Sequence, residues 1–397
     1  IQPLYLFQIL AKEEPVMRKC MILLFFAILL MPGVIGALLG GAPEGQNTEN
    51  RTLAERPELS LENLEDFPAD AEAYINDHAP FRDQFIDAYA SMNMELFHSI
   101  DNNDVIVGKE DWLFYAGNDS RVDALGISPF TEVEQWSITT QLLQIRQKYG
   151  KDRDSFVFFI APDKEIVYRQ YLPDYYAPVT DTSRAKELVK YIRENSDIQV
   201  IYPLEDLLAA SEQGLTYYKT DTHWNDYGGF VGSQELIAAL GGRTEEVRFA
   251  GEAEETASSG EGEAAGVRVS FAEGERGDLG NLGRTPMRYL DEVKAQIEGY
   301  YDELTPELLE DNPETGITRT RTEGAPDERR LVMVRDSFTE AMEPVLQKYF
   351  AESVLIDWES IESTDIGSYG GDVFVYQVVE RNLGRIPADL VSMLEGF

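Results

Sequence analysis

From Thr131 onward the chain alternates short apolar runs with helix-like segments, and this alternation constrains the fold more than any other feature. The apolar runs have few polar residues on either face, as is typical of strands that are covered on both sides. They are Ser155–Ile160, Gln199–Tyr202, Leu331–Val334, Ser353–Asp357 and Asp372–Val379. Helices are predicted at 132–149, 184–194, 228–240 and 340–350. The pattern predicts an α/β domain with a parallel sheet and helices on both faces.

Polar residues follow three of the predicted strands. Asp163, Asp221 and Ser337 each come shortly after a strand, Asp221 after a short one at Tyr217–Tyr218. Ligands in such folds bind beyond the carboxyl ends of the strands. We therefore expect these three side chains to converge at one edge of the sheet.

The sequence has three histidines, His78, His98 and His223. The first two lie in an upstream helical region, where we expect His78 to occupy a turn and His98 to be half-buried on a helix. His223 lies two positions after Asp221. Histidine is the usual general base near neutral pH because its unperturbed pKa is about 6.5. Any histidine-dependent chemistry of the α/β domain must therefore use His223.

A general base needs a nucleophile, and Ser337 is the best candidate because it stands where a strand turns into a helix. Asp-Ser before a helix is also a common N-cap pattern, and a short Asp-x-His cluster can cap a helix too. Taken together, the two motifs predict a catalytic triad of Ser337, His223 and Asp221.

Composition excludes some function classes. A formal net charge of −38 argues against nucleic acid as a partner. It also disfavours a polyanionic substrate unless a local basic groove exists. Cys20 is the single cysteine, so these 397 residues can form no internal disulfide, and no zinc-binding motif is present. We predict no metal and no cofactor.

The composition of the amino-terminal region predicts a targeting segment followed by a linker. Residues 1–16 are expected to be untranslated or flexible. Residues 17–40, a short basic start followed by about twenty mostly apolar residues, predict a signal anchor or a cleaved signal peptide, of which we favour the anchor. The basic flank places the main domain outside the cytoplasm, which gives a single-pass membrane protein.

The remainder divides by composition. Residues 41–59 predict a linker, residues 60–104 a small helical region, and residues 105–397 the catalytic domain, which begins with a β-hairpin at 105–115. Within that domain, residues 243–276 include a stretch rich in Glu, Ala, Ser and Gly, and predict a flexible acidic insertion.

Several short motifs occur in a fixed order. They are Pro162–Lys164, Tyr171–Pro173, Asp221–Trp224, Gly277–Gly280, Arg335–Phe338 and Glu380–Arg381. In this order they resemble the SGNH-hydrolase-like proteins of the alginate O-acetyltransferase type, including the related DHHW family, over roughly residues 60–397. In that family, as here, the Asp-x-His pair precedes the serine, the reverse of ordinary SGNH esterases.

The resemblance implies an SGNH-hydrolase-like fold and O-acetylation of an extracytoplasmic polysaccharide, beside a membrane-embedded acyltransferase that supplies acetyl groups. Ser337 would then carry the acetyl group, and the Ser337 backbone N–H would stabilise the oxyanion. Two rivals stay open: an extracellular carbohydrate or lipid esterase of the same fold, and a non-catalytic scaffold of the cell envelope.

Four residues are candidates for substrate binding. Trp224 either stacks on a sugar or packs against His223, and Asp278 either lines the site or caps a turn. Arg381 either orients the substrate or forms a structural ion pair. Arg335 replaces the glycine that usually opens the Gly-Asp-Ser block, which predicts a stiffer turn or a cation near the site.

Overall fold

The computed structural model describes residues 14–39, 54–58, 64–79, 81–180, 182–249, 266–286 and 291–395. The chain divides into two compact units, residues 1–97 and 98–397. Most of the predicted linker, residues 41–59, lies outside the described residues, as do residues 250–265 of the predicted acidic insertion.

The first unit is helical. It contains α2 (Glu14–Leu39), α3 (Phe67–Asp77) and α4 (Arg82–Phe97). The anchor predicted for residues 17–40 overlaps α2. No helix in the described part of the chain combines the length and the apolar character that crossing a membrane requires.

The upstream histidines are placed differently from one another. His78 follows α3 directly and stacks on Tyr74, so the prediction of a turn position is confirmed. The prediction that His98 is half-buried on a helix is wrong, because α4 ends at Phe97 and His98 is exposed, with a left-handed backbone (φ 48°). Its Nε2 atom lies 3.1 Å from the carbonyl oxygen of Gly108.

The second unit is built on a seven-stranded sheet in the order β4-β3-β12-β10-β11-β9-β8. Five adjacent strands run parallel to one another, and all five were predicted from the apolar runs. They are β3 (Phe156–Ala161), β4 (Gln199–Ile201), β10 (Asp327–Arg335), β11 (Phe350–Asp357) and β12 (Val373–Val379). The carboxyl ends of these parallel strands lie at one edge of the sheet. Asp163 follows the end of β3 and Ser337 follows the end of β10 at this edge.

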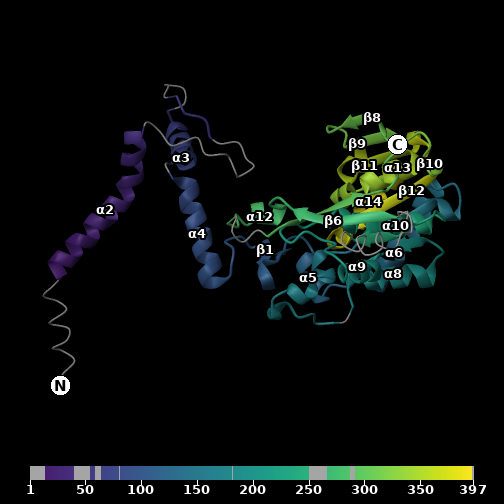
Figure 1. The fold of residues 1–397 in the computed structure, drawn as a ribbon, viewed down its shortest axis with the longest axis horizontal. Helices are drawn as coiled ribbons and strands as arrows, with labels where there is room; N and C mark the ends of the chain where they lie inside the picture. The colour runs from purple at the N-terminus through teal and green to yellow at the C-terminus, as the bar shows by residue number, and fades with distance from the viewer. Residues whose placement is uncertain are drawn as a thin grey trace, which may run out of the picture. The chain divides into compact units, whose positions relative to one another are not determined.

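The sheet is mixed rather than purely parallel. β8 (Glu307–Asn312) and β9 (Ile317–Arg321) extend it antiparallel beyond β11, as Figure 1 shows. The sequence pattern missed them because both strands are mostly polar and partly exposed, so they contain no long apolar run.

Helices cover both faces of the sheet, as predicted. Phe156, Phe158 and Ile160 of β3 pack with α6 (Glu132–Tyr149), α8 (Arg184–Asn195) and α14 (Ile386–Glu395). The alternate residues Val157 and Phe159 pack with the other face's helices, α9 (Leu204–Ser211), α10 (Asp226–Ala239) and α13 (Glu343–Tyr349). Because successive side chains of a strand point to opposite faces, one apolar run supplies both cores.

Two smaller sheets complete the unit. β1 (Val105–Val107) and β2 (Leu113–Tyr115) form the predicted hairpin. A three-stranded sheet contains β5 (Val247–Phe249), β6 (Val267–Glu273) and β7 (Val293–Glu298). The prediction of flexibility throughout 243–276 is therefore wrong at both flanks, where β5 and β6 pair in parallel.

Candidate active site

Ser337 lies on the turn that follows the carboxyl end of β10. Asp336 caps a short 3-10 helix, Ser337–Ala341, with its side chain accepting a hydrogen bond from the Phe338 amide (3.1 Å). The N-cap alternative for this motif is thus correct for Asp336, while the Ser337 hydroxyl is left for another partner. A Cβ on Gly229 of α10 would lie 2.5 Å from the Ala341 backbone, so glycine is needed for this helix to approach the turn.

His223 connects Ser337 to Asp221. Its Nε2 atom lies 2.7 Å from the Ser337 hydroxyl oxygen, and its Nδ1 atom lies 2.7 Å from Asp221 Oδ1. An ionised carboxylate only accepts hydrogen bonds, so Nδ1 carries the proton and Nε2 is free to accept from the serine hydroxyl. The three predicted residues therefore form one chain of hydrogen bonds.

The surroundings of Asp221 keep it ionised. Burial would raise its pKa, but the hydrogen bond and charge of His223, together with the Asp278 and His223 amides, lower that pKa to about 2. The two amide hydrogen bonds are 2.8 Å and 2.9 Å long. A carboxylate fixed in this way holds the imidazole in one orientation and one tautomer.

Asp278 supports the same turn from the other side. Its two carboxylate oxygens accept hydrogen bonds from the Thr222 amide and hydroxyl, both 2.7 Å long. It begins the short helix α12 (Asp278–Leu282). A Cβ on Gly277 would lie 2.5 Å from the Asp221 Cβ, so this glycine allows the two segments to meet. Both alternatives for Asp278 hold, since it lies at the site and fixes a turn.

The part of the chain that contains Asp221 and His223 matches a known protein family. A family described as "SGNH hydrolase-like domain, acetyltransferase AlgX" matches residues 105–315, which is more than half of the chain. The chain belongs to this family. The match includes Asp221, His223 and Asp278, whereas Ser337 lies beyond its end.

Individual proteins that are similar to this chain share low sequence identity with it. A probable alginate O-acetylase AlgJ from Pseudomonas syringae pv. tomato is 25% identical over 172 residues, which cover 43% of this chain and 41% of that protein. Among solved structures, a DHHW family protein from Eubacterium siraeum has a TM-score of 0.47 and 15% identity, covering 72% of this chain and 97% of that one. Bacillus cereus PatB1 has a TM-score of 0.47 and 17% identity, and the match covers 71% of this chain and 96% of PatB1.

Trp224 is buried beside the serine turn. Its side chain is 1% exposed, so it offers no ring face to a ligand. The indole N–H donates a 2.7 Å hydrogen bond to the Phe338 carbonyl, and the two rings are in contact. Trp224 therefore ties the histidine loop to the serine turn: it packs against Phe338, whereas the packing alternative had placed it against His223.

The two arginines predicted at the site are already engaged. Arg381 is 9% exposed and pairs with Asp163 (3.0 Å), while its guanidinium lies 5.0 Å from the centre of the Phe338 ring. These contacts favour its structural alternative over substrate orientation. Arg335 is the last residue of β10 and pairs across strands with Asp357 (3.2 Å). This position is regular strand, so the arginine does not stiffen the serine turn that follows.

Three buried polar residues that sequence reasoning did not assign also support the site in this AlgX-type chain. Gln377 of β12 accepts hydrogen bonds from the Asp336 amide (2.8 Å) and the Thr339 hydroxyl (2.9 Å), and its own amide donates to the Asp336 carboxylate (2.8 Å). Buried Lys164 donates to the Asp221 carbonyl (2.5 Å), and Glu292 accepts from the Thr220 amide (2.6 Å). Lys164 lies within a motif that carried the resemblance.

Asp221, His223 and Asp278 could also be considered as metal ligands. One atom from each lies within 4.8 Å of the others. In this arrangement, however, the Asp221 and Asp278 oxygens accept hydrogen bonds from His223 and Thr222, which an ion would have to displace. The cluster is therefore better matched to holding an imidazole than to binding a cation.

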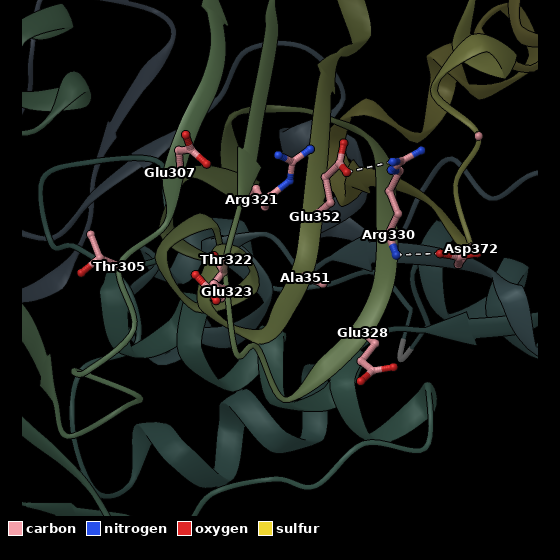
Figure 2. Close-up of a pocket in the computed structure, with 11 residues that line it drawn as sticks. Thr305, Glu307, Arg321, Thr322, Glu323, Glu328, Arg330, Ala351, Glu352 and Asp372 are labelled. Atoms are coloured by element: carbon pink, nitrogen blue, oxygen red, sulfur yellow. Dashed lines mark hydrogen bonds and ion pairs between the residues drawn. The ribbon is translucent and has the colours of Figure 1, made fainter.

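A separate cavity of about 660 Å³ lies at the opposite edge of the sheet. Figure 2 shows its lining at the start of β10 and β11, where the Arg330 side chain reaches Glu352 (2.8 Å) and its amide reaches Asp372 (2.9 Å). Ser337 follows the other end of β10. The cavity is therefore not part of the candidate active site.

Proposed function

We propose that this chain is an O-acetyltransferase that moves an acetyl group through Ser337 onto a hydroxyl group of a polysaccharide. The observation that carries the proposal is the hydrogen-bonded chain from Ser337 Oγ to His223 Nε2 and from His223 Nδ1 to Asp221 Oδ1, each link 2.7 Å long. Membership of the AlgX-type family and the similarity to a probable alginate O-acetylase support the choice of acetyl transfer.

In the first half-reaction, His223 Nε2 takes the proton of the Ser337 hydroxyl as the oxygen attacks the carbonyl carbon of an acetyl donor. Asp221 stabilises the imidazolium that forms. The Ser337 amide begins a 3-10 helix, so it has no carbonyl partner within that helix and is a donor for the developing oxyanion. The leaving group then takes the proton from His223, and Ser337 keeps the acetyl group.

In the second half-reaction, a sugar hydroxyl takes the place of the leaving group. His223 removes its proton, the sugar oxygen attacks the acetyl carbon, and the proton returns to the Ser337 oxygen as the ester bond breaks. The imidazole passes through the same two protonation states in both halves. One histidine with a fixed tautomer is therefore sufficient for the whole cycle.

We further propose that the reaction takes place outside the cytoplasm and that a membrane-embedded acyltransferase supplies the acetyl group. The basic residues Arg18 and Lys19 followed by an apolar stretch support an export or anchoring segment. Protease added to intact cells tests the location: an exported domain is digested, whereas a cytoplasmic one is protected.

An esterase of the same fold would use the same three residues and would differ only in accepting water. Product analysis separates the two functions. A soluble form beginning near Glu55 is incubated with 4-nitrophenyl acetate and mixed oligosaccharides. Acetylated oligosaccharide supports the transferase, and free acetate alone supports the esterase. A cellular phenotype that survives Ser337→Ala supports the scaffold alternative.

A further inference from the structure

Two successive peptide units of the loop that leads to the triad carboxylate lie between a buried cation and a buried anion. The carbonyl oxygens of Tyr218 and Lys219 accept hydrogen bonds from Lys164 Nζ (3.2 and 3.3 Å). The N–H groups of the same two peptide units, those of Lys219 and Thr220, donate to the Glu292 carboxylate (2.9 and 2.6 Å). The C=O and N–H bonds of a trans peptide point in opposite directions. The loop is therefore held from both sides.

The hydrogen bonds of Lys164 fit its charged form. This residue begins the short helix α7 (Lys164–Val167), and its side chain is 0% exposed. Its Nζ atom also donates to the Asp221 carbonyl oxygen (2.5 Å), so three carbonyl oxygens surround it. An ammonium group has three N–H donors and no acceptor, which matches three carbonyls. A neutral amine would direct its lone pair at one of them.

Glu292 completes the arrangement from the other side of the loop. It immediately precedes β7, is 4% exposed, and accepts a further hydrogen bond from the Thr220 hydroxyl (2.5 Å). A buried charge is costly unless hydrogen bonds and an opposite charge offset the loss of water. Burial lowers the pKa of Lys164, and nearby carboxylates, Glu292 among them, oppose that shift. Each of the two charges therefore depends on the other and on the peptide units between them.

We propose that Lys164 and Glu292 are a coupled pair of positioning residues that hold the Asp221 carboxylate against His223. The inference rests on the proposed function. Asp221 directly follows the two peptide units held by the pair, and its Oδ1 atom lies 2.7 Å from His223 Nδ1. A displacement of about 1 Å at a catalytic group can reduce a rate by about 10²-fold. Neither Lys164 nor Glu292 takes part in the chemistry, and both act through the loop.

Removing the two charges singly and together in the full chain tests the coupling. Lys164→Met and Glu292→Gln should each lower kcat for 4-nitrophenyl acetate by about 10- to 100-fold, with little change in KM. Because either change releases the same peptide units, the double variant should lose no more than the worse single variant. Losses that multiply would contradict the coupling. Urea denaturation checks that each variant is folded, and Glu292→Gln, which keeps the shape of its side chain, decides the test if Lys164→Met is not.

Glu352→Gln is the matched control. Glu352 is a similarly buried carboxylate, 7% exposed, that pairs with Arg319 and Arg330 at the opposite edge of the sheet. We expect this variant to be less stable than the wild type but to keep kcat within about twofold, because no contact joins Glu352 to the loop before Asp221. An equal loss of kcat in Glu352→Gln would show that the effect is one of general stability.

Proton NMR separates a positioning role from a loss of stability. The Nδ1 proton of His223, in its 2.7 Å hydrogen bond to Asp221, should give a strongly downfield signal, which is identified by its absence from His223→Ala. We expect this signal in the wild type and in Glu352→Gln, and its loss or upfield shift in Lys164→Met and Glu292→Gln. Folded variants of the pair that keep either the signal or the wild-type kcat would overturn the proposal. Absence of 4-nitrophenolate release from the wild type would instead overturn the proposed function, and the NMR comparison would still test the positioning of Asp221.

Discussion

The Nε2 atom of His223 lies 2.7 Å from the hydroxyl oxygen of Ser337, although 114 positions separate the two residues in the sequence. Two further contacts between the same segments hold them together. Trp224 donates to the Phe338 carbonyl (2.7 Å), and the His223 and Phe338 rings lie with their centres 5.0 Å apart. Base and nucleophile are thus aligned by their immediate neighbours in the sequence.

Replacing Asp221 should reduce activity far more than replacing Asp278. Asp221→Asn removes the acceptor that fixes the His223 tautomer, so we expect kcat to fall by about 10⁴-fold, as for the corresponding change in other triads. Asp278→Asn retains one acceptor oxygen for Thr222 and should cost about tenfold or less. Steady-state rates with 4-nitrophenyl acetate compare the two variants. Equal losses would mean that Asp221 has no special role.

Gln377 should matter for both stability and rate. Gln377→Leu leaves the buried Asp336 amide and Thr339 hydroxyl without their partner, at about 1–3 kcal/mol for each unpaired group. We expect kcat to fall and KM to change little, because the serine turn loses its support. Urea denaturation and steady-state kinetics measure the two effects. Gln347→Leu on α13 is the control, and an equal effect from it would contradict this role for Gln377.

Trp224→Phe distinguishes packing from sugar binding. Phenylalanine keeps the aromatic contact but leaves the Phe338 carbonyl without its donor, a loss of about 1 kcal/mol or more. We therefore expect a modest fall in kcat and in thermal stability, and the same KM for every acceptor. A rise in acceptor KM with kcat preserved would show instead that the indole contacts the sugar.

Stability should decrease with rising pH because of Asp123. Burial raises the pKa of this carboxyl from 3.8 to about 8. A folded-state pKa above the unfolded one means that the folded protein binds the proton more tightly. The resulting stabilisation is complete below about pH 4 and is lost as pH rises to about 8. Arg184, the cation beside Asp123, keeps Asp119 (2.6 Å) as a partner in an Asp123→Asn variant.

Urea denaturation between pH 4 and pH 8 tests this dependence. The free energy of unfolding of the wild type should fall by up to about 1.4 kcal/mol per pH unit from this one group. Asp123→Asn should lack that contribution and have a flatter profile. Parallel profiles for the two proteins would contradict the shifted pKa.

Removing metal ions should leave the rate unchanged. The atoms of Asp221, His223 and Asp278 that could bind an ion are engaged with one another and with Thr222. We expect turnover of 4-nitrophenyl acetate after dialysis against EDTA to stay within about twofold of the untreated enzyme. A loss that zinc restores would assign these residues to a metal centre.

The parts of the fold that the sequence predicts are those with strong local signals. Every residue of Phe156–Ala161 is apolar, and such a run fits a strand that is buried on both faces. β8 and β9 are mostly polar and partly exposed, and nothing local distinguishes them from a solvated loop. The pairing of β9 with β11 is a tertiary contact that a pattern of residues along the chain does not contain.

The same distinction applies to the site. Asp221, His223 and Ser337 are predictable because few residue types can serve as base and nucleophile, and residues 105–397 contain one histidine. Gln377 and Glu292 are not predictable, because a glutamine in a strand or a glutamate in a loop is ordinarily exposed. Their burial depends on which turns the fold brings beside them. For Trp224, the sequence shows that an aromatic residue lies next to His223 but does not show whether its ring is exposed to a ligand or buried.

The most direct measurement is to isolate the acetyl-enzyme. Wild type, Ser337→Ala and His223→Ala are mixed briefly with 4-nitrophenyl acetate, quenched in acid, digested and examined by mass spectrometry. Covalent catalysis by the hydrogen-bonded triad predicts one added acetyl group on the Ser337 peptide of the wild type alone, with a loss of turnover of about a thousandfold or more in both variants. Equal turnover in all three proteins, with no acetyl group on Ser337, would contradict it.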